Sequence, residues 1–407
     1  MIKGIGIDII EIDRIKSIVS KNKRFLQKIF TESEIEYIKS RNYNSNTISG
    51  LFSSKEAISK VLGTGISGFN WTDIEIIHDQ LGKPRVKLKG NAKIISDNKN
   101  IDQILLSISH SNKDAISVAI GEQNMDKSIS NIKNVNWTRG ILIKREEDSH
   151  KGTYGRVGVI AGSEGMAGAP YLTSKSALRT GSGLVYSIVP KSIFTISQIK
   201  NTEVIVKSFE CLSDIMAHSK DIDVVALGPG IGVNQNTIEM VKHILENLKK
   251  PIVLDADGIN CISQCRDVLL SRNETTIITP HPGEMSRLIN VDISEIQKNR
   301  EKYSMEVAKR YGVIVVLKGS GTVVCDGKDI YINTTGNPGM STSGSGDVLT
   351  GVIASLLGQG IGALDAAKLG AYLHGLAGDI AKEEKGEYGI IASDIIDYIP
   401  TAIKKIT

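Results

Sequence analysis

Residues 336–347 read GNPGMSTSGSGD, and an apolar run, VLTGVIASLL, follows at 348–357. Glycines allow the backbone to come close to a ligand and to turn its N–H groups towards it. The spacing of the apolar residues predicts a helix, whose first turn adds free N–H donors and the positive end of the helix dipole. This stretch therefore predicts a phosphate-binding turn.

Asp347 ends the glycine-rich turn and begins the predicted helix. A carboxylate beside bound phosphate is better placed to take a proton from a substrate hydroxyl than to bind the phosphate itself. The alternative is an aspartate that only caps the helix after a glycine turn, which is common. The other motifs of this half of the chain favour the catalytic interpretation.

Composition places the chain among globular proteins. It has 407 residues, 41% of them apolar and 23% charged, which predicts two or three domains. A net charge of only +4 argues against a nucleic-acid partner. No apolar run approaches the roughly 20 residues of a membrane span, and charged residues from Asp8 onwards argue against a signal peptide. The four cysteines show no zinc pattern, so we expect reduced thiols in a cytoplasmic protein.

A polar stretch at residues 122–137 predicts a linker between a first part, 1–121, and a second part, 138–407. In the second part short apolar runs alternate with amphipathic helices, which predicts a parallel sheet with helices on both faces. The expected strands are 156–161, 223–227, 251–255, 275–279 and 313–318, and the expected helices 170–180, 235–248 and 294–311. Ligands of such folds bind at the carboxyl ends of the strands.

A glycine- or proline-containing motif follows each of these strands. The motifs are GSEGMAGA (162–169), GPGIG (228–232), DADG (255–258), TPHPGE (279–284) and KGSGT (318–322). Each alone is compatible with an ordinary turn, but five at one sheet edge favour a shared ligand site.

Four side chains of these motifs suggest particular roles. His281, held between two prolines, favours a ligand contact over a structural role. Lys318 can neutralise phosphate, with Thr322 as a hydroxyl donor. Asp255 and Asp257 are candidate magnesium ligands or supports of such a site, or helix caps.

These motifs, with GNPGMSTSGSGDVLTG (336–351) and LHGLAGD (373–379), closely resemble the ADP-dependent NAD(P)H-hydrate dehydratase family of the ribokinase-like superfamily. The resemblance covers about residues 151–407 and implies a three-layer α/β/α domain. A ribokinase-like sugar kinase would share the GSGD turn but not TPHPGE together with KGSGT. A small-molecule kinase is the alternative function of this part.

The family repairs NADH or NADPH whose nicotinamide ring has taken up water. The resemblance implies that the NADH/NADPH hydrate is contacted by Ala169, Gly230, His281 and Asp347. It implies that ADP, or ATP, is held by Lys318, Gly319, Ser320, Gly321, Thr322 and Gly346. In the kinase-like mechanism that the residues suggest, Asp347 deprotonates the ring hydroxyl, which takes up the terminal phosphoryl group and then leaves as phosphate, with Mg²⁺ assisting the transfer.

In the first part, Asp8 ends an apolar strand expected at 3–9, and Glu56 and Lys60 lie four residues apart on a helix expected at 50–62. The Glu56–Lys60 pair alone would be a surface salt bridge. An unpaired carboxylate in an apolar strand is costly unless it binds a cation, and carboxylate oxygens suit Mg²⁺. His110 follows a strand at 104–109, paired with one at 115–120, and contacts a phosphate or caps a loop.

This pattern resembles holo-acyl-carrier-protein synthase across about residues 1–121. The motifs are GIGIDIIEIDRI (4–15), FSSKEAISKVLGTGI (52–66), GKP (82–84) and SISHS (107–111). The resemblance implies an α+β, 4′-phosphopantetheinyl transferase-like domain that transfers 4′-phosphopantetheine from coenzyme A to a serine of acyl carrier protein. Asp8 and Glu56 would bind Mg²⁺, and Lys60 and His110 would contact the coenzyme A phosphates.

One position departs from that family, which usually has an arginine where this chain has Leu51. Arg41 or Lys55 could take the place of that arginine in holding coenzyme A. The two resemblances together imply a bifunctional enzyme. The transferase resemblance also leads us to expect a homo-oligomer, since such transferases commonly build their sites between subunits. The alternative is that the first part is an inactive oligomerisation module.

Overall fold

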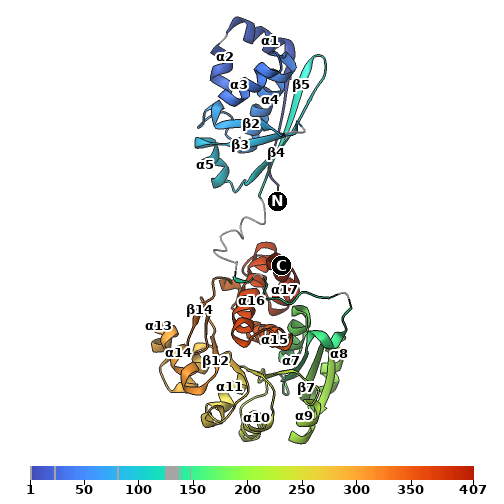
Figure 1. Cartoon of the computed structure of the whole chain (residues 1–407), viewed down its shortest axis with the longest axis vertical. Helices are drawn as coiled ribbons and strands as arrows, with labels where there is room; N and C mark the ends of the chain where they lie inside the picture. Colours follow the sequence, from blue (N-terminus) through green and yellow to red (C-terminus); the bar gives the residue numbers. More distant parts are fainter. Residues whose placement is uncertain (1, 23, 80–81, 124–136, 139, 147) are drawn as a thin grey trace. The chain divides into compact units, whose positions relative to one another are not determined.

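The computed structural model describes residues 2–22, 24–79, 82–123, 137–138, 140–146 and 148–407. The chain divides into two compact units, residues 1–133 and 134–407 (Figure 1). Most of the predicted linker lies outside the described residues. The exact domain boundaries therefore stay a prediction.

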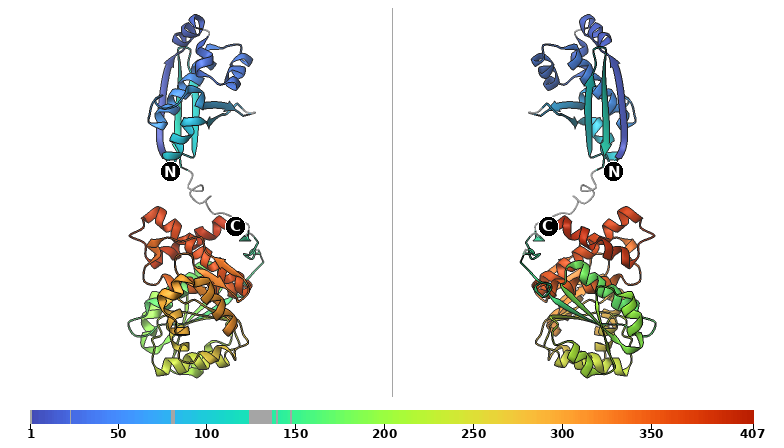
Figure 2. Two further views of the ribbon diagram at one scale, coloured as in Figure 1. Left: turned by 90° about the vertical axis from the view of Figure 1, so that its left-hand side faces the viewer. Right: turned by 90° about the vertical axis from the view of Figure 1, so that its right-hand side faces the viewer.

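The first unit is a three-stranded antiparallel sheet, in the order β1-β5-β4, with helices on one face and a separate β2–β3 hairpin. Figure 2 shows the long strands side by side. The elements are β1 Ile2–Glu11, α1 Ile12–Lys21, α2 Arg24–Ile29, α3 Glu32–Ser40, α4 Ser45–Leu62, η1 Trp71–Asp73, β2 Ile74–His78, β3 Pro84–Leu88, α5 Gly90–Asn98, β4 Gln103–His110 and β5 Asp114–Glu122. The predicted strands and the helix at 50–62 are confirmed, although α4 begins earlier.

Glycines of β1 allow α4 to lie directly on the sheet. A Cβ atom added to Gly6 would lie 2.0 Å from the backbone oxygen of Ala57, and one added to Gly4 would lie 2.9 Å from that of Val61. Both contacts are with helix backbone, which cannot turn away as a side chain can. The GIGID sequence is therefore what lets α4 approach the strand that carries Asp8.

The second unit contains a nine-stranded sheet in the order β14-β13-β12-β11-β10-β9-β6-β7-β8. Its strands are β6 Arg156–Ile160, β7 Leu184–Pro190, β8 Ile205–Phe209, β9 Val224–Leu227, β10 Ile252–Leu254, β11 Thr276–Ile278, β12 Ile314–Leu317, β13 Val323–Cys325 and β14 Ile330–Ile332. Its α-helices are α7 Gly168–Thr180, α8 Phe194–Lys200, α9 Leu212–His218, α10 Gln235–Asn247, α11 Asp257–Ile262, α12 Pro282–Ile289, α13 Ile293–Lys298, α14 Arg300–Tyr311, α15 Ser345–Gly358, α16 Ala363–Lys385 and α17 Ala392–Ile406. Short 3₁₀ helices are η3 Lys151–Tyr154, η4 Lys191–Ile193, η5 Arg266–Leu269 and η6 Pro338–Met340.

The strands from β12 to β8 run parallel, whereas β13 and β14 pair antiparallel at one edge. The sheet is therefore mixed, not purely parallel as the sequence predicted. The single helix predicted at 294–311 is two helices in the structure, since α13 ends at Lys298 and α14 begins at Arg300. Among the described residues, no helix is long and apolar enough to cross a membrane.

Successive strand residues face two different cores, which is why these strands read as continuous apolar runs. Val157, Val224 and Val253 pack with α7, α15 and α16 on one face. Val225 and Ile252 pack with α10, α12 and α14 on the other. The expected three-layer α/β/α domain is confirmed, and the parallel strands bring the motifs at their carboxyl ends to one edge.

The close contact between β1 and α4 makes a testable prediction. Gly6→Ala pushes α4 away from β1, because the new Cβ meets helix backbone, and should destabilise the first unit by about 1–3 kcal/mol. Denaturant unfolding followed by circular dichroism measures this. The control is Gly362→Ala in the second unit, where an added Cβ meets nothing within 4 Å. Equal stability of the two variants would contradict the role given to Gly6.

Candidate active sites

Lys318 lies at the centre of a charged cluster at the carboxyl edge of the large sheet. Its Nζ atom is 2.6 Å from Oδ1 of Asp255 and 3.8 Å from Oε2 of Glu284. Burial opposes the charged form of Lys318, but these two carboxyl groups outweigh it, so the pKa of Lys318 is raised. Lys318 is therefore a fixed positive charge at this edge.

Asp255 fixes that lysine. Its Oδ1 accepts the hydrogen bond from Lys318, and its Oδ2 accepts one of 2.7 Å from the hydroxyl of Thr350 in α15. Both carboxylate oxygens are thus engaged by protein groups. Of the roles considered for Asp255, this structure supports the positioning of Lys318 and not the ligation of magnesium.

Asp347 is the third residue of α15, half-buried beside this cluster. Burial raises the pKa of its carboxyl group to about 7, the charge of Asp255 adds to the effect, and Lys318 opposes it. A carboxyl group with a pKa near the working pH is well matched to general base catalysis.

His281 and Glu284 form a capping box at the start of α12. His281 Nδ1 accepts from the N–H of Gly283 at 2.9 Å, and Nε2 lies 3.2 Å from Oε1 of Glu284. Burial raises the pKa of Glu284 to about 7, while burial and then Lys318 lower that of His281. His281 thus supports the start of α12 through Nδ1, while 48% of its side chain stays exposed, so a ligand can still reach it.

A cavity of about 440 Å³ opens beside Lys318. All the residues that the sequence predicted for the nucleotide line it: Lys318, Gly319, Ser320, Gly321, Thr322 and Gly346. They come from the loop after β12 and from the first turn of α15. A Cβ on Gly346 would lie 3.2 Å from Nζ of Lys318, so a larger residue would crowd the lysine.

Ala169 and Gly230 also lie together at this edge. A Cβ added to Gly230 would be 3.1 Å from that of Ala169, and Gly230 has a φ of +66°, which disfavours any side chain there. The next glycine, Gly232, donates to Oδ2 of Asp257 at 2.9 Å. Ala169, Gly230 and Asp257 thus lie on neighbouring loops at this edge of the sheet.

Several residues that line the cavity were given no role from the sequence. They are Asn333, Thr335, Asn337, Ser345 and His374. His374 is buried, Nε2 lies 3.3 Å from the hydroxyl of Ser345, and burial lowers its pKa to about 4. Its position in the LHGLAGD motif of α16 could have marked His374 as a site residue. Only the fold shows that α16 forms one wall of the cavity.

In the first unit, the structure brings Asp8, Glu56 and Lys60 together. Nζ of Lys60 is 2.9 Å from Oδ1 of Asp8 and donates to the backbone oxygen of Ile7 at 2.7 Å. Burial raises the pKa of Glu56, and the nearby charge of Asp8 raises it further, against Lys60. Two neighbouring carboxyl groups fit a divalent cation, although no cluster of three or more acidic, histidine or cysteine residues occurs among the described residues.

His110 is not brought to these residues within one chain. It ends β4, and β5 lies between β4 and β1, so about 10 Å of sheet separates the two strands. His110 therefore makes no direct contact with Asp8 in a single chain, and its contact with coenzyme A stays a prediction.

The prediction that Lys55 could replace the missing arginine was wrong. Its side chain is fully buried and paired with Glu34, so it is inaccessible to coenzyme A. Leu51 is only 2% exposed and belongs to the core of the unit. Arg41 is exposed, with its guanidinium 5.4 Å from the ring centre of Tyr37, and remains the available candidate.

Comparison with known proteins identifies both parts. Residues 157–401 match the family model described as NAD(P)H-hydrate dehydratase, and residues 4–113 match that of the 4′-phosphopantetheinyl transferase superfamily. A solved ADP/ATP-dependent NAD(P)H-hydrate dehydratase from Bacillus subtilis, co-crystallised with ATP/Mg²⁺, is 28% identical with a TM-score of 0.60, covering 67% of this chain and 98% of that one.

Two curated relatives match the second part. A bifunctional NAD(P)H-hydrate repair enzyme of Moorella thermoacetica is 40% identical over 282 residues, covering 66% of this chain and 53% of the relative. An ADP-dependent (S)-NAD(P)H-hydrate dehydratase of Neisseria meningitidis is 38% identical over 256 residues, covering 62% and 86%. The chain spans about half the length of the bifunctional relatives. It belongs to the NAD(P)H-hydrate dehydratase family and carries, ahead of its dehydratase domain, a domain of the 4′-phosphopantetheinyl transferase superfamily.

Proposed function

We propose that the second unit catalyses the ADP-dependent dehydration of NADH or NADPH hydrate, and is thus a hydro-lyase. The observation that carries this proposal is Asp347, a carboxyl group with a pKa of about 7, beside a cavity lined by Lys318 and the loop to Thr322. The names of the relatives, one of them ADP-dependent, support the same reaction. ATP in place of ADP is compatible with the same cavity.

In the proposed mechanism the oxygen of the ring hydroxyl attacks the terminal phosphorus of the nucleotide, and Asp347 accepts the proton of that hydroxyl. The new oxygen–phosphorus bond replaces the bond to the rest of the nucleotide, which leaves as AMP when ADP is used. The carbon–oxygen bond of the ring then breaks, phosphate departs, and the neighbouring carbon loses a proton to restore the double bond. Lys318 and the free N–H groups of α15 stabilise the charge that develops on the phosphoryl oxygens.

Magnesium would be held here with the phosphates of the nucleotide, beside the carboxyl group of Asp347, because oxygen ligands suit this ion. When bound with the nucleotide, the ion neutralises phosphate charge. Asp347 still does the proton transfer.

The pKa of Asp347 sets the expected pH dependence. Its ionised form is the base, so kcat should rise with pH to a plateau, with a midpoint near 7. Asp347→Asn should lower kcat by about 10²-fold or more and remove this rise, because the amide cannot accept the proton. NADH recovery measures the rate, and nucleotide binding by calorimetry shows that the cavity is intact. Full turnover of the variant would refute this role.

We also propose that the first unit transfers 4′-phosphopantetheine from coenzyme A to a serine of an acyl carrier protein. Asp8 and Glu56 would hold Mg²⁺ with the coenzyme A pyrophosphate, and Lys60 would contact its phosphates. Glu56, with its raised pKa, is placed to accept the serine proton as the serine oxygen bonds to phosphorus and the nucleotide part of coenzyme A leaves. The bound ion supplies charge neutralisation at the pyrophosphate.

A mass measurement tests the transferase. With coenzyme A and Mg²⁺, apo-carrier protein should gain the mass of phosphopantetheine with the wild-type chain, and at least about 10²-fold more slowly with Asp8→Asn or Glu56→Gln. Dehydratase turnover of the same variants is the internal control. An unmodified carrier with wild-type enzyme would favour the alternative, an inactive module that serves assembly.

We further propose a homo-oligomer in which a second copy covers the open face of the β1-β5-β4 sheet. Large apolar side chains on this face are 38–63% exposed, namely Ile5, Ile7, Ile9, Leu105 and Ile116. Apolar exposure on this scale favours a covered surface. A second copy could also supply the His110 that a single chain keeps apart from Asp8.

A charge on this face should break the assembly. Ile7→Glu should lower the molar mass measured by light scattering and abolish carrier modification, while dehydratase turnover persists. Ile94→Glu, at a similarly exposed residue of α5 outside the sheet, is the matched control and should change neither. An unchanged mass for Ile7→Glu would contradict the proposed interface.

A further inference from the structure

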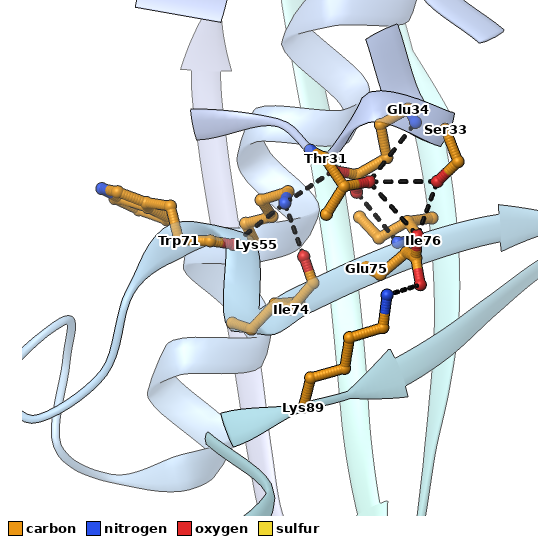
Figure 3. Close-up of polar contacts among 9 residues, drawn as sticks. All are labelled: Thr31, Ser33, Glu34, Lys55, Trp71, Ile74, Glu75, Ile76 and Lys89. Atoms are coloured by element: carbon orange, nitrogen blue, oxygen red, sulfur yellow. Dashed lines mark hydrogen bonds and ion pairs between the residues drawn. The ribbon is translucent and has the colours of Figure 1, made fainter. Parts of the chain in front are cut away.

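Lys55, the residue before Glu56, is buried in an ion pair that the proposed chemistry does not use (Figure 3). Its Nζ is 2.8 Å from Oε2 of Glu34, and both side chains have no exposed surface. The ammonium group also donates to the backbone oxygens of Trp71 at 3.0 Å and Ile74 at 2.5 Å. These three partners use its three hydrogens, so the charge is fully paired.

Glu34 is equally occupied. Its Oε2 accepts from the N–H of Thr31 at 2.7 Å, and its Oε1 accepts from that of Ile76 at 2.8 Å. The Glu34–Lys55 pair therefore joins the start of α3, the middle of α4 and the strand β2. Buried ion pairs contribute little net stability, because desolvation offsets their attraction, but they impose a defined geometry on the groups that they join.

The opposite side of the same helical turn is anchored to the sheet. The hydroxyl groups of Ser53 and Ser54 lie 2.6 Å and 2.9 Å from that of Ser117 in β5. Ser117 stands in register with Asp8 of β1. This hydroxyl cluster ties the turn of α4 to the strand position that carries the first carboxylate.

Glu56 lies between these two anchors. Successive helix residues point about 100° apart, so the directions of Ser53 and Lys55 flank that of Glu56. With one anchor holding α4 to β5 and the other holding it to α3 and β2, the turn has little freedom to rotate or slide. Both contacts therefore restrain the part of α4 that carries Glu56.

We infer that Lys55 and Glu34 are positioning residues that hold Glu56 opposite Asp8 for the divalent cation and the coenzyme A pyrophosphate. The inference rests on the proposed transferase function. It gives Lys55 a role through its neighbour and no contact with coenzyme A.

The test is a double substitution, Lys55→Met with Glu34→Gln, which removes both buried charges together so that neither is left unpaired. Coenzyme A binding with Mg²⁺, measured by calorimetry on the full chain, should weaken by about tenfold or more. Hydrogen exchange of the α4 amides around Glu56 should become faster. Circular dichroism and dehydratase turnover should be unchanged, which shows that the chain is folded.

Lys89→Met is the matched control. Lys89 pairs with Glu75 of β2 at 2.7 Å in the same network (Figure 3). Its side chain is half-exposed, and its ion pair does not involve α4. Its loss should change neither the binding nor the exchange. Equal binding by the wild type and the double variant would overturn the inference while the transferase stands; failure of the wild type to bind coenzyme A would overturn both.

Discussion

The ion pair between Lys318 and Asp255, 2.6 Å apart, is the interaction on which the larger site depends. Parallel strands end at one edge, so Asp255 from β10 and Lys318 from β12 meet there together with Glu284 and Asp347. Without the lysine, these three buried or half-buried carboxyl groups would repel one another and take up protons. With it, Asp347 keeps a pKa of about 7 and can exchange a proton at neutral pH.

In the first unit, a close backbone contact between β1 and α4 brings the two carboxyl groups together. Gly6 lets α4 lie on β1, and this brings Glu56 of the helix to Asp8 of the strand. In each unit the proposed active-site side chains come from a strand or the loop after it and from a neighbouring helix: Asp8 and Glu56 in the first unit, Lys318 and Asp347 in the second. In the first unit, Lys60 supplies one positive charge beside the carboxyl groups of Asp8 and Glu56. A divalent ion would neutralise the remaining negative charge.

The sequence predicted β6 and β9–β12, which are continuous apolar runs that end in a glycine- or proline-containing motif. It missed β7, which is also apolar and mostly buried, and β8, whose residues Val206 and Lys207 alternate between buried and exposed. It also missed β13 and β14, which pair antiparallel at the edge of the sheet. The residues of the nucleotide cavity were predicted through motifs, although their binding roles stay predictions. The Glu34–Lys55 pair could not be predicted, since it depends on how α3 packs against α4. Glu34 also forms a capping box with Thr31 at the start of α3, a role that depends on local sequence alone.

The central claim is that the larger site uses phosphoryl transfer to remove water from a hydrated nicotinamide ring. The most direct measurement follows NADH absorbance, inorganic phosphate and AMP together, in a reaction of the purified chain with NADH hydrate, ADP and Mg²⁺. The account predicts that all three appear in equal amounts. A phosphorylated product that accumulates without recovery of NADH would contradict it and identify a small-molecule kinase.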